Sequence, residues 1–289
     1  MNYAARVVIE EPTLPLEDEL GDVLEKAMRR AACTPEMVAR LAGVSFAKIR
    51  DAVDYRPDLS CDELRRIAAV LELNEVGLCA LGSGRYPMPD LGLLPFWVLP
   101  LRMPHGIGVA NAYLVGECGE HHAILFDTGA GIEALEAVWP ARIRTLDAVF
   151  LTHAEQEHVG GLCDVVERFK APVALIPDGA TAPCGRSMGE GETRRFGTLR
   201  VTAFATPGHS AAHNCYLVER QGLRAGSGLL ISGDLVFAGS VGGAYFSHEQ
   251  LQTSLSRMLR VVAPRTVIAP GHGPMTTAEN ELRFNPFLS

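Results

Sequence analysis

The chain has 289 residues, of which 47% are hydrophobic and 21% charged, and its formal net charge at pH 7 is -8. This composition is typical of a soluble globular protein with one large domain and a small one. The negative charge disfavours general attraction to nucleic acid or to an anionic membrane. Because no apolar run is long enough to span a bilayer and the first residues lack the pattern of a secretory signal, we expect a cytoplasmic protein without membrane contact.

Four or five short helices are predicted for the first 81 residues. Apolar residues recur at helical spacing from Leu16 to Met28, which predicts an amphipathic helix over this range. Further helix-start signals follow at Thr34, Ser45 and Ser60. Together they predict a small all-α region in front of the rest of the chain.

The segment 34–73 resembles the helix-turn-helix domains of the lambda-repressor type, with "LAGVS" at the turn between two helices. In that family the next helix enters the major groove, and in this chain it would present Lys48 and Arg50 but also Asp51. Residues 1–86 carry more acidic than basic side chains, whereas a groove-binding domain usually has the opposite balance. We therefore favour a packing or dimerisation module, compatible with a homodimer, over a DNA reader.

A stretch rich in glycine and proline, residues 81–95, predicts a joint near residue 88. The predicted units are a small helical domain with its linker over 1–88 and a main domain over 89–289. In the main domain, apolar runs predict strands at "FWVLPL", "NAYLV", "AILFD", "DAVFLT", "VALI", "LRVTAF", "CYLV", "LLISGD" and "TVIAP". Helices are predicted at "GIEALEAVW", "GGLCDVVERF" and "SHEQLQTSLSRMLRVV". This mixture indicates an α/β fold in which helices cover sheets.

Candidate metal ligands follow four of the predicted strands. They lie in "THAEQEHVGG", "TPGHS", "SGDLVF" and "APGHG", and they are His153, Glu155, Glu157, His158, His209, Asp234 and His272. Ligands from several loops at one rim of a sheet can surround one ion, or two ions about 3.5 to 4 Å apart. Imidazole and carboxylate donors together suit zinc, iron or manganese. The pattern therefore predicts one or two divalent metal ions.

The order of these motifs resembles the metallo-beta-lactamase superfamily over roughly residues 93–289. The ending "PGHGPMTTAENELRFNPFL" is particularly like small hydrolases related to glyoxalase II. The resemblance implies an αββα sandwich with two metal positions bridged by Asp234, while Asp127 in "FDTGAG" supports the site from outside. It implies that the first position is held by His153, Glu155 and His209 and the second by Glu157, His158 and His272.

Two positions depart from the T-H-x-H-x-D-H pattern usual in that family. Glu155 stands where a second histidine is usual, and Glu157 stands where an aspartate is usual. A carboxylate in place of an imidazole shifts the preference towards iron or manganese without excluding zinc. Flavodiiron proteins of the same superfamily show H-x-E-x-D-H, so Glu155 resembles a di-iron variant. The longer side chain of Glu157 has to move or chelate differently to reach the same ion.

The leading hypothesis is a metal-dependent hydrolase. A metal-bound hydroxide would attack an ester, thioester or lactone-like carbonyl of a small-molecule substrate, with Asp234 and Glu157 as catalytic carboxylates. Tyr245 and His248 are interpreted as substrate contacts, with capping of the following helix as another role for His248. The remaining histidines are interpreted as structural or solvated groups, namely His105, His121, His122 and His213.

Two alternative functions stay open at this point. Glu155 suggests a di-iron protein that binds oxygen or carries out redox chemistry. The helix-turn-helix resemblance suggests a transcriptional regulator whose main domain senses a ligand. Iron content would favour the first, and salt-sensitive DNA binding would favour the second.

Overall fold

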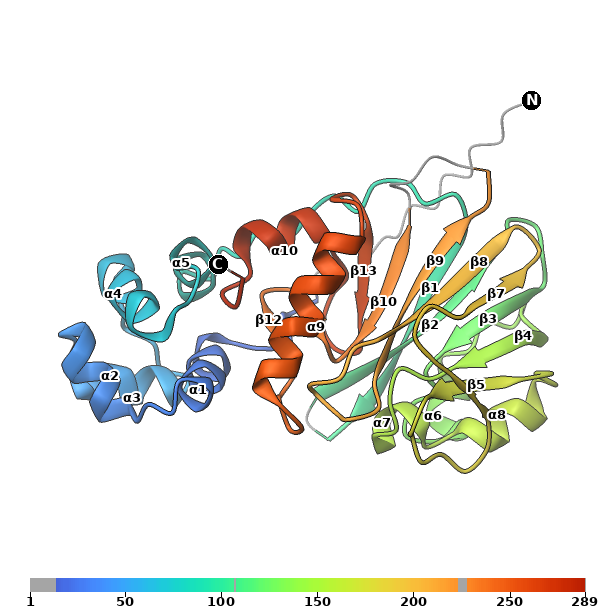
Figure 1. Cartoon of the computed structure of the whole chain (residues 1–289), viewed down its shortest axis with the longest axis horizontal. Coiled ribbons are helices and arrows are strands. Elements are labelled where there is room, and N and C mark those ends of the chain that lie inside the picture. The colour runs from blue at the N-terminus through green and yellow to red at the C-terminus, as the bar shows by residue number, and fades with distance from the viewer. Residues whose placement is uncertain (1–13, 107, 223–227, 289) are drawn as a thin grey trace.

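Two six-stranded sheets pack face to face in the computed structural model, which describes residues 14–106, 108–222 and 228–288. Helices cover the outer face of each sheet, and a group of helices from the N-terminal region lies at one end of the sandwich (Figure 1). This arrangement confirms the predicted α/β sandwich preceded by a small all-α region. No helix among the described residues is long and apolar enough to cross a membrane.

The first sheet has the strand order β1-β2-β3-β4-β5-β6. β1, β2 and β3 pair antiparallel, whereas β3 to β6 run parallel. Parallel strands end at the same edge of a sheet, so the loops that follow β3 and β4 meet there. α6 and α8 cover the outer face through an apolar cluster. The bounds are β1 (Trp97–His105), β2 (Gly108–Gly116), β3 (His122–Phe126), β4 (Thr145–Phe150), β5 (Ala174–Pro177), β6 (Arg186–Met188), α6 (Ile132–Ala137) and α8 (Leu162–Arg168).

The second sheet has the strand order β14-β13-β10-β9-β8-β7. A small hairpin of β11 and β12 follows β10, and α9 packs on the outer face of the sheet (Figure 1). The bounds are β7 (Thr193–Phe196), β8 (Leu199–Ala205), β9 (Asn214–Arg220), β10 (Leu229–Gly233), β11 (Val236–Phe237), β12 (Ser240–Val241), β13 (Val267–Pro270), β14 (Thr276–Thr277), α9 (His248–Val261) and α10 (Ala278–Phe284). Buried aromatic rings of Phe126, Phe150 and Tyr216 lie between the sheets, with centroids 5.1 to 5.8 Å apart. They fix the distance between the two sheets.

Every strand predicted from an apolar run is present, and so are the three predicted helices of the main domain. Sequence periodicity does not predict the short strands β6, β7, β11, β12 and β14, nor the helices α7 (Gln156–Val159) and α10. Segments of 2 to 7 residues are too short to show a helical or alternating period.

The N-terminal region contains α1 (Leu20–Arg30), α2 (Pro35–Ala42), α3 (Phe46–Val53), α4 (Cys61–Leu71) and α5 (Glu75–Gly82). We call this group of five helices the helical module. The predicted start of its first helix at Leu16 is wrong, because the helix begins four residues later, at Leu20. The Asp22 carboxylate accepts a hydrogen bond from the Glu19 amide at 2.8 Å and fixes the start there. Residues 14–18 therefore lie outside the helix.

The helical module shares one continuous apolar core with the main domain. Leu24 and Leu78 belong to the same buried cluster as Val241 and Leu255. The predicted joint near residue 88 lies in the segment between α5 and β1, so it divides the sequence but not the core. The module therefore packs on the main domain as part of one structure.

Asn74 connects the helical module to the C-terminal segment. Its amide donates to the Pro286 carbonyl at 2.8 Å, and its side chain donates to the Arg283 and Leu288 carbonyls at 3.1 Å. The Arg30 guanidinium lies 5.5 Å from the centre of the Phe287 ring. These contacts fix the orientation of the module.

Gly77 of α5 lies directly against this C-terminal segment, and a Cβ at this position would be 1.9 Å from the Phe284 carbonyl oxygen. We expect Gly77→Ala to lower the free energy of unfolding by about 1–3 kcal/mol. A loss of stability would point to the contact with the C-terminal segment, because alanine by itself favours a helix over glycine by about 1 kcal/mol. Chemical denaturation would measure the change, with Val76→Ala, which is 53% exposed, as the control. A Gly77→Ala protein as stable as the wild type would contradict the packing of α5 on the C-terminal segment.

Candidate metal centre

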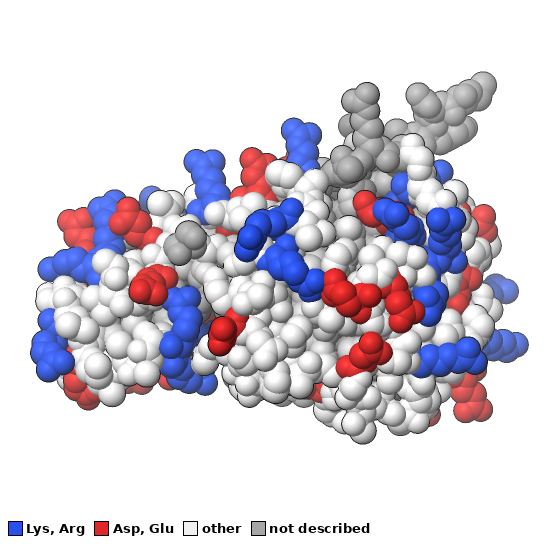
Figure 2. Space-filling view, viewed as in Figure 1, with Lys and Arg blue, Asp and Glu red and all other residues white. Residues whose placement is uncertain are grey.

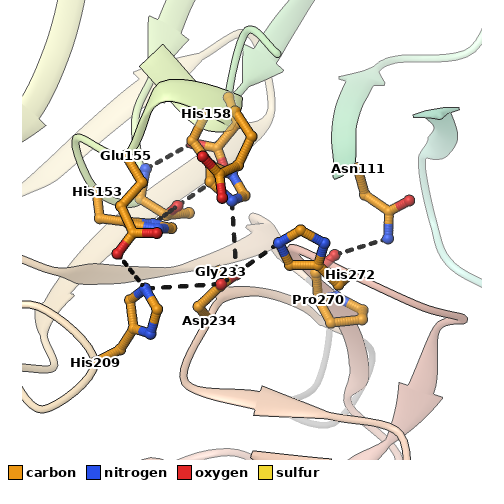
Figure 3. A network of polar contacts seen from close by, with 12 residues as sticks. Asn111, His153, Glu155, His158, His209, Gly233, Asp234, Pro270 and His272 are labelled. Carbon is orange, nitrogen blue, oxygen red and sulfur yellow. Dashed lines mark hydrogen bonds and ion pairs between the residues drawn. The ribbon is translucent and has the colours of Figure 1, made fainter. Parts of the chain in front are cut away.

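All seven candidate ligands lie at one rim of the sandwich. Figure 3 labels six of them, and the seventh is Glu157. Four of them come from the loop and short helix after β4, and each of the others follows β8, β10 or β13. The structure brings together groups that are as much as 119 residues apart in the sequence, from His153 to His272. Their role as metal ligands stays a prediction. The geometry of the rim shows whether their side chains could hold an ion.

Among the described residues, three groups of side chains form at this rim, each with donor atoms within 4.8 Å of one another. His153, His158 and Asp234 make up one of them, and it shares one histidine with each of the other two. Those two are as follows. One contains His153, Glu155 and His209. The other contains Glu157, His158 and His272. They are the same two groups that the family resemblance implies. Glu157 thus reaches the second group in spite of its longer side chain.

Asp234 lies between the two groups and faces both of them. Its Oδ1 is 3.7 Å from His158 Nε2, and its Oδ2 is 3.7 Å from His209 Nε2 and 3.5 Å from His272 Nε2. Gly271 leaves room for this carboxylate, because a Cβ at this position would be 2.1 Å from Asp234 Oδ1. The position of Asp234 fits a carboxylate that bridges two ions.

The four imidazoles are held from outside through Nδ1. His209 Nδ1 donates to the Gly243 carbonyl at 2.8 Å and His272 Nδ1 donates to the Val109 carbonyl at 2.9 Å, since a carbonyl can only accept. In the neutral form of each ring the lone pair is then on Nε2, and both Nε2 atoms face the centre. Hydrogen bonds of this kind fix the tautomer and orientation of metal-binding histidines.

Asp127 holds the remaining two imidazoles. One carboxylate oxygen lies 3.0 Å from His158 Nδ1 and accepts from the Thr152 hydroxyl at 2.9 Å. Thr152 Oγ1 is in turn 2.9 Å from His153 Nδ1. Asp127 adopts a left-handed backbone conformation with φ of 60°, which is uncommon outside glycine and is maintained by the surrounding contacts. Its predicted role, to support the site from outside, agrees with these contacts.

Buried atoms without a hydrogen-bond partner converge on the centre of the site. Among the residues that the structure describes, they include His153 Nε2, His158 Nε2 and Asp234 Oδ1. Such atoms are destabilising unless something binds them, by about 1–3 kcal/mol each. Glu155 occupies the N-cap of α7 without a capping hydrogen bond from its side chain, and its Oε1 lies 2.9 Å from His209 Nε2. The residues present therefore fit one or two divalent cations with nitrogen and oxygen ligands.

The pKa values of the site reflect opposing effects of burial and charge. Burial lowers the pKa of His158, but the Asp127 carboxylate outweighs it and raises this pKa to about 9. Burial, together with the neighbouring imidazoles, holds the pKa of His153 well below its ordinary value. Burial raises the pKa of Asp234, but the imidazoles of His158, His272 and His209 outweigh it and lower this pKa. Asp234 is therefore charged at pH 7.

His213 and His122 have surroundings that fit their interpretation as structural or solvated histidines. His213 is buried beside the site, with its Nδ1 2.7 Å from Thr206 Oγ1, and its Nε2 accepts from the Asp234 amide at 3.2 Å. Burial lowers the pKa of His213 to about 3, so it stays neutral and supports the backbone of Asp234. His122 pairs with Asp147 at 2.6 Å, away from the site.

Sequence reasoning missed His105, whose Nε2 lies 3.7 Å from Glu157 Oε1. His105 ends β1, and only the pairing of β1 with β2 brings it to the ligand rim. In the sequence, the signal that could have indicated His105 was its position at the end of a predicted strand. The carbonyls of Gly243 and Val109 had no signal in the sequence, because any residue has a carbonyl.

Tyr245 and His248 line a cavity between α1 and the segment 241–248. The Tyr245 ring is 75% exposed, with its centroid 5.3 Å from that of His209. The alternative role of His248 as a helix cap is wrong, because Ser247 caps α9 and accepts from the Gln250 amide at 3.3 Å. Tyr245 thus lies beside a candidate ligand, and His248 shares the cavity with Tyr245.

Removal of the Asp127 carboxylate should weaken metal binding. We expect Asp127→Asn to lower the affinity for zinc about 10- to 100-fold, because the amide no longer orients His158 and Thr152 as the carboxylate does. Competition with a chelating indicator would measure the change. Asp147→Asn, which removes a partly exposed carboxylate from the same sheet, is the control and should bind zinc like the wild type. Equal affinity in both variants would contradict the role of Asp127.

Metal affinity should also rise with pH up to about pH 9. Below that pH, His158 is protonated in the metal-free protein, and an ion must displace the proton from Nε2. Each pH unit between 7 and 9 should therefore strengthen apparent zinc binding by up to about tenfold. Titrations at several pH values would show this slope, and Asp127→Asn should flatten it, because the charge that raises the pKa of His158 is gone. A wild-type affinity independent of pH would contradict the assignment.

Comparison with known proteins places these residues in a family. The model of the metallo-beta-lactamase superfamily matches residues 105–272. The probable metallo-hydrolase YqgX of Bacillus subtilis (strain 168) is 29% identical over 211 residues, which cover 65% of this chain and 96% of that protein. Hydroxyacylglutathione hydrolase of Salmonella typhi is 31% identical over 128 residues, which cover 43% of this chain and 46% of that protein. The likeness to glyoxalase II is therefore partial.

Among solved structures, the di-iron-bound form of TTHA1623 is 32% identical, with a TM-score of 0.52, and covers 66% of this chain and 100% of that one. The family match spans more than half of the chain and includes every candidate ligand. The helical module lies outside it. On the fold, the motifs and this match, the chain belongs to the metallo-beta-lactamase superfamily.

Proposed function

We propose that this protein is a metal-dependent hydrolase that acts on the carbonyl of an ester, thioester or lactone-like small molecule. The observation that carries the proposal is the convergence of buried, unpartnered His153 Nε2, His158 Nε2 and Asp234 Oδ1 atoms at one rim. When bound, one or two divalent ions would supply Lewis acidity and lower the pKa of a water in the site. Hydrolase names among the relatives support the same reaction class.

Asp234 would orient the attacking water. Its carboxylate is charged at pH 7, and Oδ1 is buried without a hydrogen-bond partner among the described residues, so it can accept a hydrogen bond from that water. Glu157 lies at the outer side of the site, where its side chain is 16% exposed. Its carboxylate can accept the proton that the attacking water loses and pass it to the leaving alcohol or thiol. No side-chain nucleophile is required.

Tyr245 and His248 would contact the part of the substrate that does not react. Both line the cavity between α1 and segment 241–248, and the exposed Tyr245 ring stands next to His209. The Tyr245 hydroxyl can donate a hydrogen bond, and its ring can pack against an apolar group. These contacts would decide which acyl compound fits.

A di-iron oxygen-binding or redox protein is the second candidate. The observation that favours it is Glu155, whose carboxylate takes part in the first ligand group where the family usually has an imidazole. An oxygen donor favours iron or manganese over zinc. The similar TTHA1623 was solved with two iron ions, which supports the same choice of metal.

A DNA-binding regulator has less support from the helical module. Lys48 lies 3.0 Å from Glu63, and Arg50 lies 3.1 Å from Asp51, so both cations of the candidate recognition helix are paired within the chain. On the face drawn in Figure 2, blue and red side chains are interspersed over this end of the molecule. Such a surface gives little attraction to phosphates.

The test is elemental analysis of protein purified without added metal, with an absorption spectrum and a panel of esters, thioesters and lactones. We expect bound metal and hydrolysis, and we expect Asp234→Asn to lower kcat/KM by at least about 100-fold because the bridging carboxylate is lost. Asp58→Asn, whose side chain is 93% exposed, should leave hydrolysis unchanged. Stoichiometric iron with a charge-transfer band and no hydrolysis of any substrate would favour the di-iron candidate instead.

A further inference from the structure

The segment that precedes α1 reaches the rim of the metal centre. Glu17 lies in this segment, and its Oε1 is 3.9 Å from Nδ1 of His272. Its backbone also touches the loop that carries His272, since a Cβ on Gly273 would be 3.0 Å from the Glu17 amide nitrogen. A residue of the N-terminal region thus stands next to a candidate ligand of the main domain.

Glu17 faces the outer side of the His272 ring. On the inner side, His272 Nε2 points to Asp234 Oδ2 at 3.5 Å, while Nδ1 on the outer side donates to the Val109 carbonyl. The Glu17 carboxylate therefore lies beside the N–H group and away from the position of an ion. Among the residues that the structure describes, His272 is the only one within ion-pair distance of Glu17.

Contacts of the next residue hold Glu17 in place. Asp18 is 8% exposed, and its carboxylate accepts hydrogen bonds from Lys26 of α1 and from the Ser240 hydroxyl. Lys26 also donates to the Val241 carbonyl at 2.7 Å. Ser240 and Val241 form β12, in the chain between Asp234 and Gly243, whose carbonyl accepts from His209. The same buried contacts therefore hold the segment before α1 against the chain between Asp234 and Gly243.

We infer that Glu17 is a positioning residue of the metal centre, which holds His272 in the orientation that an ion requires. This inference rests on the metal set of the proposed function. A carboxylate beside the Nδ1–H group stabilises the positive charge that the imidazole gains when Nε2 binds a cation, and it makes Nε2 a stronger donor. The segment before α1, which lies outside the family match, then supports the second ligand group from the outer side of His272.

The test compares zinc binding by full-length wild type, Glu17→Gln, Glu17→Asp and Glu25→Gln proteins. Glu25 is the matched control, because it belongs to α1 and its side chain is 54% exposed. Competition titrations with a chelating indicator give the Kd of the weaker of two zinc ions, and thermal unfolding gives the Tm of each metal-free protein. We expect Glu17→Gln to raise the Kd of the ion held by Glu157, His158 and His272 about tenfold. This is the lower end of the effects of residues that orient a ligand, and we expect no change in the metal-free Tm. Glu17→Asp should lie nearer the wild type, and Glu25→Gln should match it.

Three results would overturn the inference. They are a Glu17→Gln protein that binds both ions like the wild type, a wild-type protein that takes up only one ion, and a loss of affinity that comes with a lower metal-free Tm. The last would show that Glu17 only stabilises the fold. Hydrolysis is scored separately: a wild type that binds two ions but cleaves no substrate contradicts the proposed hydrolase and leaves the role of Glu17 standing.

Discussion

The arrangement of this rim depends on buried polar atoms that no protein group satisfies. His153 Nε2, His158 Nε2 and Asp234 Oδ1 are taken from water and receive no hydrogen bond from the described residues. Each such atom opposes folding by about 1–3 kcal/mol, so the surrounding structure must hold them together against their tendency to be hydrated. A cation that accepts several lone pairs at once relieves this penalty, and for this reason a metal centre explains the geometry better than a structural polar cluster does.

The scaffold meets this constraint with contacts on the outer side of every ring. Asp127 binds His158 and Thr152, while backbone carbonyls accept from His209 and His272. Parallel strands bring Asp127 and the loop after β4 to the same edge, and the aromatic cluster between the sheets fixes the other loops opposite them. The proposed chemistry therefore relies on packing far from the reacting atoms as well as on the ligands.

The helical module belongs to this support. Its core is continuous with the outer layer of the second sheet, and Asn74 binds the C-terminal segment. Asp18 and Lys26 connect α1 to β12. The region that resembles a DNA-binding domain in sequence packs on the rest of the chain. The cations of α3 pair with neighbouring acids, and the apolar face of α3 is buried against α1 and α2. The resemblance to helix-turn-helix domains does not by itself indicate this packing.

The sequence by itself determined the strands that carry apolar runs, three helices of the main domain and the identity of the candidate ligands, because apolar periodicity and motif order are local properties. It also determined the two ligand groups, through the family resemblance carried by "THAEQEHVGG" and the three later motifs. Only the tertiary structure decided that Glu157 reaches the second group and that His105 and Glu17 stand beside the site. These features depend on strand pairing and on the packing of residues more than 50 positions apart, as between His105 and Glu157, and no local pattern encodes such distances.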